Sequence, residues 1–300
     1  MHSRRKKYNF AIVFNSKQTV MKLLKRIATL VLILSVSLPA CASVLDTIQV
    51  YSPSMKRKIN VSVIKPDNIT PRDTLPTVYL LHGYGDNNIR GYLGLSNVRS
   101  YADALRLLIV IPDAETSWYF DSPIDPKCRF ETFVSSELVK YIDANYPTKA
   151  DRSARAVTGL SMGGHGALFL AIRHQDTFGA AGSMSGGVDF RPFPNSWDIK
   201  LRLGTKANNP KTWDAYTVMA QLPKLKPGAL SLIIDCGTED FFYKVNCNLH
   251  AELTRLGIPH EFTSRPGNHS WNYWKRSLRD HMLFFNDFFH KATVEVPFCN

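Results

Sequence analysis

Short apolar runs alternate along the chain with stretches in which apolar residues recur at helical spacing. The apolar runs end near Gly, Pro or Asp, which is typical of buried strands. They predict strands within residues 47–51, 59–64, 76–85, 107–113, 154–161, 178–187, 229–237 and 260–267. The helical spacing predicts helices over residues 131–146, 163–174, 247–256 and 272–289.

Nearly continuous apolar strands separated by helices are typical of a mostly parallel sheet with helices on both faces. We therefore expect an α/β fold, in which ligands bind beyond the carboxyl ends of the strands. Residues 188–227 break the alternation, because they are rich in proline and contain Trp197 and Trp213. We expect this stretch to be an excursion over the site rather than a second domain.

The first 42 residues have the pattern of a secretory signal peptide. A basic head at residues 21–26 precedes an apolar segment at 27–40, and Ala40-Cys41-Ala42 has the small-x-small form of a cleavage site. The apolar segment is too short for a membrane anchor, so we expect export to the periplasm or beyond the cell. The residues before Met21 fit an over-extended start. In an alternative interpretation Leu38 to Cys41 form a lipobox and Cys41 carries a lipid.

Removal of that segment changes the charge of the chain. Residues 1–42 carry eight of the basic residues and no acidic ones, so the net charge of +12 falls to +4. A charge this small no longer favours a nucleic-acid partner. The remaining residues, 43–300, contain no repeat, linker or long charge run and predict a single domain.

Four cysteines remain in this domain: Cys128, Cys236, Cys247 and Cys299. An oxidising compartment permits disulfides, but four cysteines allow three pairings and the sequence does not choose between them. No two of them have metal-binding CxxC spacing. We expect neither a metal nor a cofactor.

Gly159-Leu160-Ser161-Met162-Gly163 lies between a predicted strand and a predicted helix. In this context G-x-S-x-G is a nucleophile elbow, a tight turn that exposes the serine hydroxyl at the start of a helix. The glycines provide room for the turn. Ser161 is therefore the candidate nucleophile.

A serine nucleophile needs a histidine base and a carboxylate that orients it, and on such a sheet they follow in the order Ser, Asp, His. Asp240 lies in the loop beyond a predicted strand and is preferred to Glu239 beside it and to Asp235 on the strand. His269 lies in the loop after the last predicted strand. The histidines set aside lie on predicted helices or at a strand start: His165, His250, His260, His281 and His290.

Acyl transfer also needs donors for the oxyanion. The backbone N–H of Met162 is one candidate, and that of Tyr84, with Gly83 as the alternative, is the second. Trp118 and Tyr119 follow the strand that ends near Asp113, on the ligand side of the sheet. Their rings are candidates for stacking on a sugar or a phenolic acyl group, and packing beneath a lid is the alternative.

Four motifs in this order carry a family resemblance: LLHGYGDN (80–87), GLSMGGHGAL (159–168), DCGTEDFFY (235–243) and GNHSWNYW (267–274). From about Val50 to Phe289 the chain resembles the esterase D group of α/β-hydrolases. That group includes S-formylglutathione hydrolases, tributyrin-type, feruloyl and acetyl-xylan esterases, and the mycolyltransferases. The resemblance implies Ser161 as nucleophile, Asp240 as acid and His269 as base, with the Tyr84 and Met162 N–H groups as oxyanion donors.

The residues and the resemblance together predict an exported serine esterase. The substrate is expected to be an acetyl, feruloyl or short-chain acyl ester, with carbohydrate-linked esters favoured. Activity is expected to rise through roughly pH 6–7, because the base must be neutral. One alternative is an acyltransferase of the mycolyltransferase type, and another is a non-catalytic binding protein on the same fold.

Overall fold

The computed structural model describes residues 20–22, 25, 43–70 and 72–290. The described residues from 43 to 290 belong to one compact unit. Of the predicted signal peptide, only residues 20–22 and 25 are described. Cys41, the candidate lipidation site, and Cys299 lie outside the described residues.

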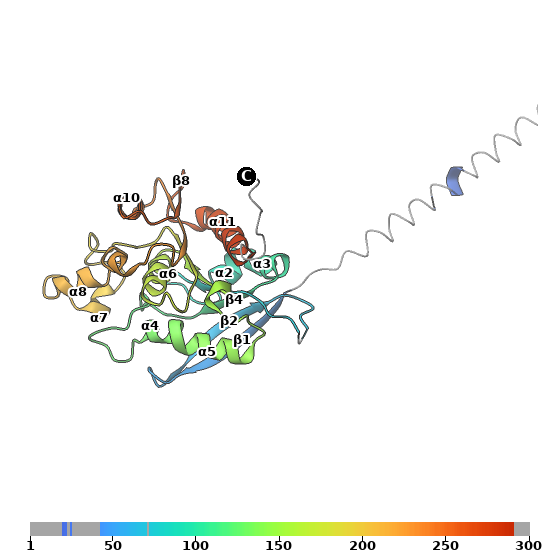
Figure 1. Ribbon diagram of the computed structural model, residues 1–300, viewed down its shortest axis with the longest axis horizontal. Coiled ribbons are helices and arrows are strands. Elements are labelled where there is room, and N and C mark those ends of the chain that lie inside the picture. Colours follow the sequence, from blue (N-terminus) through green and yellow to red (C-terminus); the bar gives the residue numbers. More distant parts are fainter. Residues whose placement is uncertain (1–19, 23–24, 26–42, 71, 291–300) are drawn as a thin grey trace, which may run out of the picture. The chain divides into compact units, whose positions relative to one another are not determined.

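Eight strands form one sheet in the order β1-β2-β4-β3-β5-β6-β7-β8 (Figure 1). β2 pairs antiparallel with β1 and β4, whereas β3 to β8 run parallel to one another. The expected α/β fold with a mostly parallel sheet is confirmed. The strands are β1 (Val44–Ser52), β2 (Arg57–Lys65), β3 (Thr77–Leu81), β4 (Leu108–Pro112), β5 (Arg155–Gly159), β6 (Ala180–Met184), β7 (Ser231–Gly237) and β8 (Glu261–Arg265).

Helices cover both faces of the sheet. The predicted helix at 131–146 is one run of α4, a π-helical segment η1 and α5, and the predicted helix at 247–256 begins earlier, at Tyr243. The helices are α2 (Tyr92–Leu95), α3 (Val98–Leu105), α4 (Phe130–Thr132), η1 (Phe133–Glu137), α5 (Leu138–Asn145), η2 (Arg152–Ala154), α6 (Met162–Arg173), α7 (Ile199–Leu203), α8 (Pro210–Ala215), α9 (Val218–Gln221), η3 (Leu222–Lys224), α10 (Tyr243–Arg255) and α11 (Trp271–His290).

The hydrophobic core has two parts, one on each face of the sheet. Successive side chains of a strand point to opposite faces, so Tyr79 and Leu81 of β3 join one cluster and Val78 and Leu80 join the other. All four side chains are fully buried. A strand buried on both faces needs an unbroken apolar sequence, which is why the alternation typical of a half-exposed strand is missing here.

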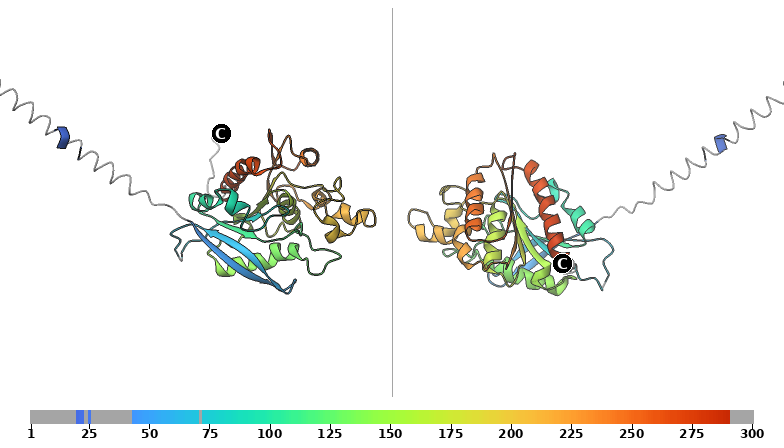
Figure 2. Two further views of the ribbon diagram at one scale, coloured as in Figure 1. Left: turned by 180° about the vertical axis from the view of Figure 1, so that it is seen from behind. Right: turned by 45° about the horizontal axis from the view of Figure 1, so that its top comes forward.

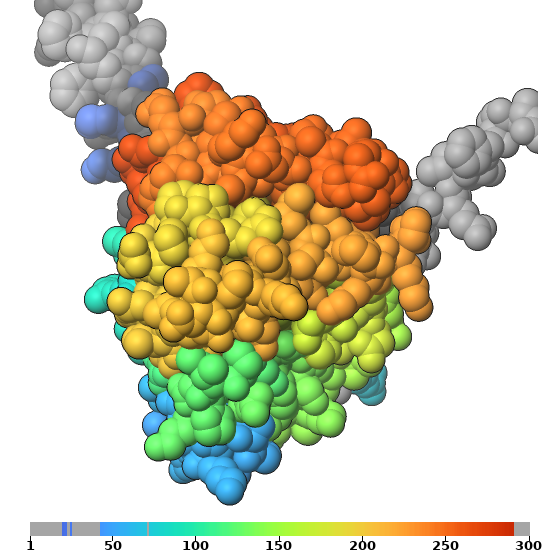
Figure 3. All heavy atoms as spheres, turned by 90° about the vertical axis from the view of Figure 1, so that its left-hand side faces the viewer, coloured from blue at the N-terminus to red at the C-terminus, as the bar shows by residue number. Residues whose placement is uncertain are grey.

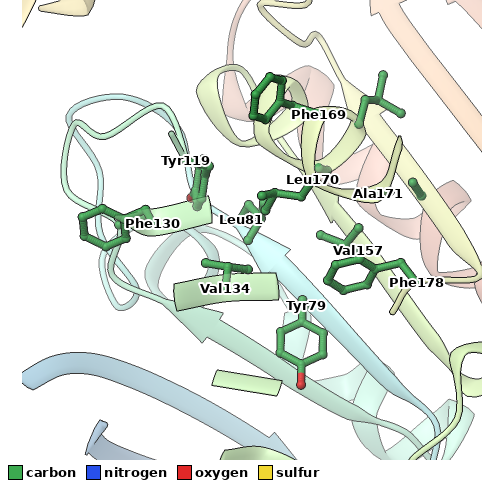
Figure 4. Packing of buried hydrophobic residues seen from close by; sticks show 14 of the residues in the cluster. Tyr79, Leu81, Tyr119, Phe130, Val134, Val157, Phe169, Leu170, Ala171 and Phe178 are labelled. Carbon is green, nitrogen blue, oxygen red and sulfur yellow. The ribbon is translucent and has the colours of Figure 1, made fainter. Parts of the chain in front are cut away.

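α6 packs against β3, β5 and β6 on the first face, and α11 packs against β6 and β7 on the second, beside α3 (Figure 2). Figure 4 shows part of the first cluster, with Phe169, Leu170 and Ala171 of α6 above side chains of β3 and β5. α6 is buried from Met162 to Ile172. The helix that starts at the nucleophile elbow is therefore held by the core.

The segment between β6 and β7 contains the short helices α7, α8, α9 and η3. It projects to one side of the sheet in Figure 1 and covers much of the face seen in Figure 3, where it is yellow to orange. Trp213 is fully buried inside it and donates a hydrogen bond to the Gly204 carbonyl at 2.8 Å. Among the described residues, no helix is long and apolar enough to cross a membrane.

Candidate active site

Ser161 lies on the tight turn between β5 and α6, in a strained backbone conformation with φ +55° and ψ −117°. The surrounding backbone holds this conformation: the Ser161 N–H donates to the Met184 carbonyl at 3.0 Å, and the Ser161 carbonyl accepts from Gly187 N–H at 3.1 Å. Such strain costs about 1–3 kcal/mol and is typical of functional sites.

Two glycines allow β3 to lie directly against the turn. A Cβ at Gly159 would be 2.5 Å from the Leu81 carbonyl oxygen, and a Cβ at Gly163 would be 2.1 Å from the same atom. Any larger residue would push the two segments apart. The G-x-S-x-G pattern therefore reflects backbone-to-backbone contact between β3 and the elbow.

A row of hydrogen bonds connects Ser161 to His269 and Asp240. His269 Nε2 lies 2.9 Å from Ser161 Oγ, and His269 Nδ1 lies 2.7 Å from Asp240 Oδ2. An ionised carboxylate only accepts hydrogen bonds, so Nδ1 carries the proton and Nε2 is free to accept from the serine hydroxyl. The Asp240 side chain is fully buried, and its Oδ1 accepts from the Phe242 N–H at 2.8 Å.

The other acidic candidates lie elsewhere. Asp235 is paired with His281 inside the molecule at 2.8 Å, and the side chain of Glu239 is exposed. The structure thus brings together the three residues that the sequence favoured.

The histidines that the sequence set aside have other surroundings. His250 and His260 contact each other at 2.8 Å. His165 is enclosed by the rings of Trp118, Phe120 and other aromatic residues, and its burial lowers its pKa to about 3. Such a histidine stays neutral at physiological pH. Its backbone N–H donates to the Ser161 carbonyl at 3.1 Å, while its ring packs against the aromatic side chains.

The loop after β3 brings a second backbone donor to the elbow. Tyr84 and Ser161 line the same cavity, and a Cβ at Gly83 would be 2.6 Å from Leu160 Cδ1. His82 holds the loop from below: its Nε2 accepts from Ala114 N–H at 2.9 Å, so its Nδ1 carries the proton and donates to the Gly83 carbonyl at 2.8 Å.

This bond orients the Tyr84 N–H. The Gly83 carbonyl and the Tyr84 N–H belong to one planar trans peptide and point in opposite directions. Met162 is the first residue of α6, a position at which the N–H has no acceptor one turn earlier. Both N–H groups are therefore suited to donate hydrogen bonds to a negatively charged oxygen of a ligand.

The cavity at Ser161 has a volume of about 330 Å³ and aromatic walls. Arg90 and Asp86 lie at its rim, with Arg90 Nε 3.7 Å from Asp86 Oδ1. The lining residues are Gly83, Tyr84, Gly85, Asp86, Arg90, Leu95, Leu160, Ser161, Trp197, Phe241, His269, Trp271 and Trp274. The volume is at the lower end of the range for small-molecule sites.

Trp118 and Tyr119 do not line this cavity, so the expectation that their rings stack on a substrate is wrong for this structure. Their exposed fractions are 1% and 0%. Both residues have positive φ, 56° and 60°, which turns the chain into the interior. Trp118 Nε1 donates to the Trp197 carbonyl at 3.2 Å, and the Tyr119 hydroxyl donates to the His82 carbonyl at 3.0 Å. Through these bonds Trp118 supports the segment that carries Trp197, and Tyr119 supports the loop that carries Tyr84.

The aromatic residues that do line the cavity were not among the candidates predicted from the sequence. Trp197 and Phe241 are stacked with ring centres 5.6 Å apart, and Phe241 lies 4.3 Å from the His269 ring. Trp274 meets His269 edge-on at 4.8 Å. A usable signal was present, because Phe241 directly follows Asp240 and Trp271 is two residues beyond His269.

None of the three described cysteines lines the cavity at Ser161. Cys128, Cys236 and Cys247 carry free thiols, and burial raises the pKa of Cys128 to about 11. Within residues 43–70 and 72–290, no group of three or more His, Cys, Asp or Glu side chains is arranged to hold a metal.

Comparisons with known proteins find similarity to esterases and to an acyltransferase. The family model “Putative esterase” matches residues 52–285. An acetyl esterase from Caldicellulosiruptor saccharolyticus is 25% identical over 251 residues, 77% of this chain and 94% of that protein. A solved ferulic acid esterase superposes with a TM-score of 0.69 at 28% identity, covering 83% of this chain and 99% of that one. A diacylglycerol acyltransferase/mycolyltransferase Ag85B from Mycobacterium leprae is 27% identical over 270 residues, 78% of this chain and 80% of that protein.

Proposed function

The chain belongs to the esterase family whose model it matches, and from this premise we propose that it cleaves esters through an acyl-enzyme on Ser161. It is a carboxylic ester hydrolase with an α/β-hydrolase fold, as its resemblance to the esterase D group predicted. The observation that carries the proposed mechanism is the row Ser161–His269–Asp240, with its distances of 2.9 and 2.7 Å.

In the first half-reaction His269 Nε2 takes the hydroxyl proton while Ser161 Oγ attacks the ester carbonyl carbon. The carbonyl oxygen becomes an oxyanion and accepts from the N–H groups of Tyr84 and Met162. When the tetrahedral adduct collapses, the bond to the alcohol breaks and His269 returns its proton to the leaving oxygen. Asp240 stabilises the imidazolium that exists between these steps.

In the second half-reaction water replaces the alcohol. His269 takes a proton from the water, whose oxygen attacks the acyl carbon, and a second oxyanion occupies the same two donors. Collapse releases the carboxylic acid and returns the proton to Ser161 Oγ. One oxyanion donor is typically worth about 10²- to 10³-fold in kcat, so both N–H groups are central to the rate.

For the substrate we propose an acetyl, feruloyl or short-chain acyl ester, preferably linked to a carbohydrate. The support is the small cavity with aromatic walls, since Trp197, Phe241, Trp271 and Trp274 offer flat apolar surfaces to a sugar or a phenolic ring. The acetyl esterase and ferulic acid esterase relatives point the same way.

A panel of four esters tests the proposal: p-nitrophenyl acetate, p-nitrophenyl butyrate, methyl ferulate and acetylated xylan, each with wild type and Ser161→Ala. We expect the variant to fold normally and to be inactive on all four. Turnover of ferulate or xylan well above that of the generic esters supports a carbohydrate-linked substrate. Turnover of the generic esters alone contradicts that choice of substrate, and equal activity of the variant contradicts the mechanism.

Acyl transfer is the second candidate, because the mycolyltransferase relative covers most of the chain. An alcohol in place of water would accept the acyl group from Ser161 by the same steps. The test is to add sugar or glycerol acceptors during turnover and to separate the products. Hydrolysis yields only free acid, whereas transfer yields new ester in proportion to the acceptor.

We also propose export, on the support of the signal-peptide pattern in residues 1–42. Mass spectrometry of the protein purified from its native host tests this directly. A mature chain that begins at Ser43 is the expected result. A lipid-modified Cys41 at the amino terminus would establish the lipobox alternative instead, and an uncleaved chain would contradict both.

A further inference from the structure

We propose that Asp198 is a positioning residue for ester hydrolysis, which acts by holding Tyr84 so that the Tyr84 backbone N–H stays aimed at the oxyanion. The inference rests on the proposed role of that N–H group. Asp198 belongs to the excursion between β6 and β7 and is 114 residues away from Tyr84 in the sequence. No motif connects the two residues.

The central observation is a hydrogen bond between the loop after β3 and the excursion. The Tyr84 hydroxyl donates to Asp198 Oδ2 at 2.7 Å, while Tyr84 itself lines the cavity beside Ser161. The bond to the carboxylate raises the pKa of Tyr84, so the hydroxyl remains a donor throughout the neutral range. A charge-assisted bond of this length is stronger than one between neutral groups.

Tyr84 needs this second anchor because of the loop that follows it. His82 fixes one end of the Gly83–Tyr84 peptide through the Gly83 carbonyl. Beyond Tyr84 the chain enters Gly85 at φ +75°, a residue type with wide conformational freedom. The Asp86 N–H donates to the Gly83 carbonyl at 3.2 Å, and Arg90 donates to the Gly85 carbonyl, so the backbone of the loop has its own bonds. Asp198 adds an anchor for the Tyr84 side chain itself.

The excursion is strained at the point of contact. Trp197 and Asp198 are consecutive non-glycine residues with φ +54°. Trp118 holds the Trp197 carbonyl, and Phe241 stacks on the Trp197 ring. The strained turn thus places the Trp197 side chain in the cavity wall and directs the Asp198 side chain at Tyr84. Maintained backbone strain of this kind is typical of segments that position functional groups.

The competing explanation is that Asp198 merely helps to bind substrate at the cavity mouth. The two explanations differ in the kinetic constant they affect. A group that orients an oxyanion donor acts in the transition state and lowers kcat, whereas a group that binds substrate equally in both states raises KM.

The first experiment compares Asp198→Ala, Asp198→Asn, Tyr84→Phe and the double variant Tyr84→Phe/Asp198→Ala on p-nitrophenyl acetate. We expect kcat to fall about 10- to 100-fold in Asp198→Ala and Tyr84→Phe, because a small misplacement of a catalytic group has effects of this size. KM should change little. The double variant should match the single ones, and Asp198→Asn, which keeps an acceptor oxygen, should recover part of the rate.

Asp214→Ala is the matched control. Asp214 lies in the same excursion, on α8, and pairs with Arg191 at 2.9 Å, but it is exposed and does not line the cavity. Its kcat and KM should equal those of wild type. Circular dichroism and active-site titration with a fluorophosphonate check that each variant is folded and that Ser161 is accessible.

Inhibition by an alkylboronic acid supplies the second readout. Boron adds to the serine oxygen and forms a tetrahedral anion, which makes it an analogue of the oxyanion intermediate. Inhibition should weaken in Asp198→Ala by the same factor as kcat. Unchanged inhibition, an effect on KM alone, or additive effects in the double variant would overturn the inference. If wild type and Ser161→Ala are equally inactive on every ester, the proposed function itself fails.

Discussion

The molecule contains two rows of the same chemical groups, and only one has access to a substrate. Asp240, His269 and Ser161 form the row at the cavity. Asp235 and Thr158 form the other row on either side of His281, at 2.8 and 2.7 Å, with all three residues buried. The hydrogen-bond distances alone do not distinguish the two rows.

The differences lie around the hydroxyl groups. Thr158 lies within β5, in regular backbone, and belongs to a strand that is buried throughout. Ser161 lies three residues further on, at positive φ, and shares its cavity with Tyr84. An acid–base–hydroxyl row supports catalysis only where a strained turn, oxyanion donors and an open space accompany it.

The buried row has a structural role in this comparison. Ser277 donates to Asp235 Oδ1 at 2.5 Å, and Arg265 donates to Ser277 Oγ at 2.8 Å. These bonds connect α11 to β7 and β8. Since α11 begins with the cavity residue Trp271, the buried row stabilises the element that forms one wall of the site.

The largest expected contrast comes from removing each hydroxyl. Ser161→Ala should lower kcat by about 10⁶-fold and leave the melting temperature nearly unchanged, because triad serines have effects of this order. Thr158→Val leaves a buried imidazole nitrogen without a partner and should cost about 1–3 kcal/mol of stability. Its kcat should remain within a few-fold of wild type. Steady-state kinetics and thermal denaturation of both variants decide this, and an inactive, fully stable Thr158→Val protein would refute the division of roles.

Removing the charge of each aspartate gives the next contrast. Asp240→Asn should lower kcat by about 10⁴-fold, because the amide holds His269 in the wrong tautomer. Asp235→Asn breaks a buried network and should cost about 3–5 kcal/mol in the free energy of unfolding. Urea denaturation and kinetics below the unfolding transition separate the two effects. A stable Asp235→Asn protein with a 10⁴-fold loss would show that the buried row takes part in the reaction.

A third histidine extends the comparison of the two rows. His165 is buried among aromatic rings. Burial lowers its pKa to about 3, whereas an unfolded chain has the ordinary value near 6.5. The unfolded state therefore binds more protons in this range, and the stabilising contribution, complete above about pH 6.5, is lost as the pH falls toward 3.

Replacement of this ring tests the effect. His165→Phe should reduce the difference between the melting temperatures at pH 7.5 and pH 4.5 by about 5–10 °C. Each protein is compared with itself at the two pH values, so a change in the absolute stability of the variant does not affect the result. An undiminished difference would assign the acid sensitivity to other groups.

The sheet and the row Ser161–His269–Asp240 could be predicted from the sequence for physical reasons. Strands buried on both faces have unbroken apolar runs, and the chain order Ser, Asp, His follows from the loops at the carboxyl edge of the sheet. Asp240 could be preferred to Asp235 because it lies beyond the strand end, and the structure pairs Asp235 with His281.

The residues of the cavity walls could not be predicted in the same way. Trp118 and Tyr119 follow a strand end, as site residues often do, but two consecutive positive φ angles direct them inward. Sequence patterns rarely reveal such angles in non-glycine residues. Trp197 and Tyr84 line one cavity through a contact between distant loops, and periodicity carries no information about such contacts.

The excursion leaves the sheet at the carboxyl end of β6, after Met184, and returns at the amino end of β7, at Ser231; the two strands are parallel neighbours. The sheet therefore fixes the separation of its two ends, at opposite ends of two adjacent strands, whatever the length of chain between them. The entropic cost of closing a loop rises only by about 0.6 kcal/mol for each doubling of its length. Descendants of this protein could thus lengthen, shorten or exchange the segment that carries Trp197 and acquire new substrates, while the elbow and the sheet beneath it are inherited unchanged.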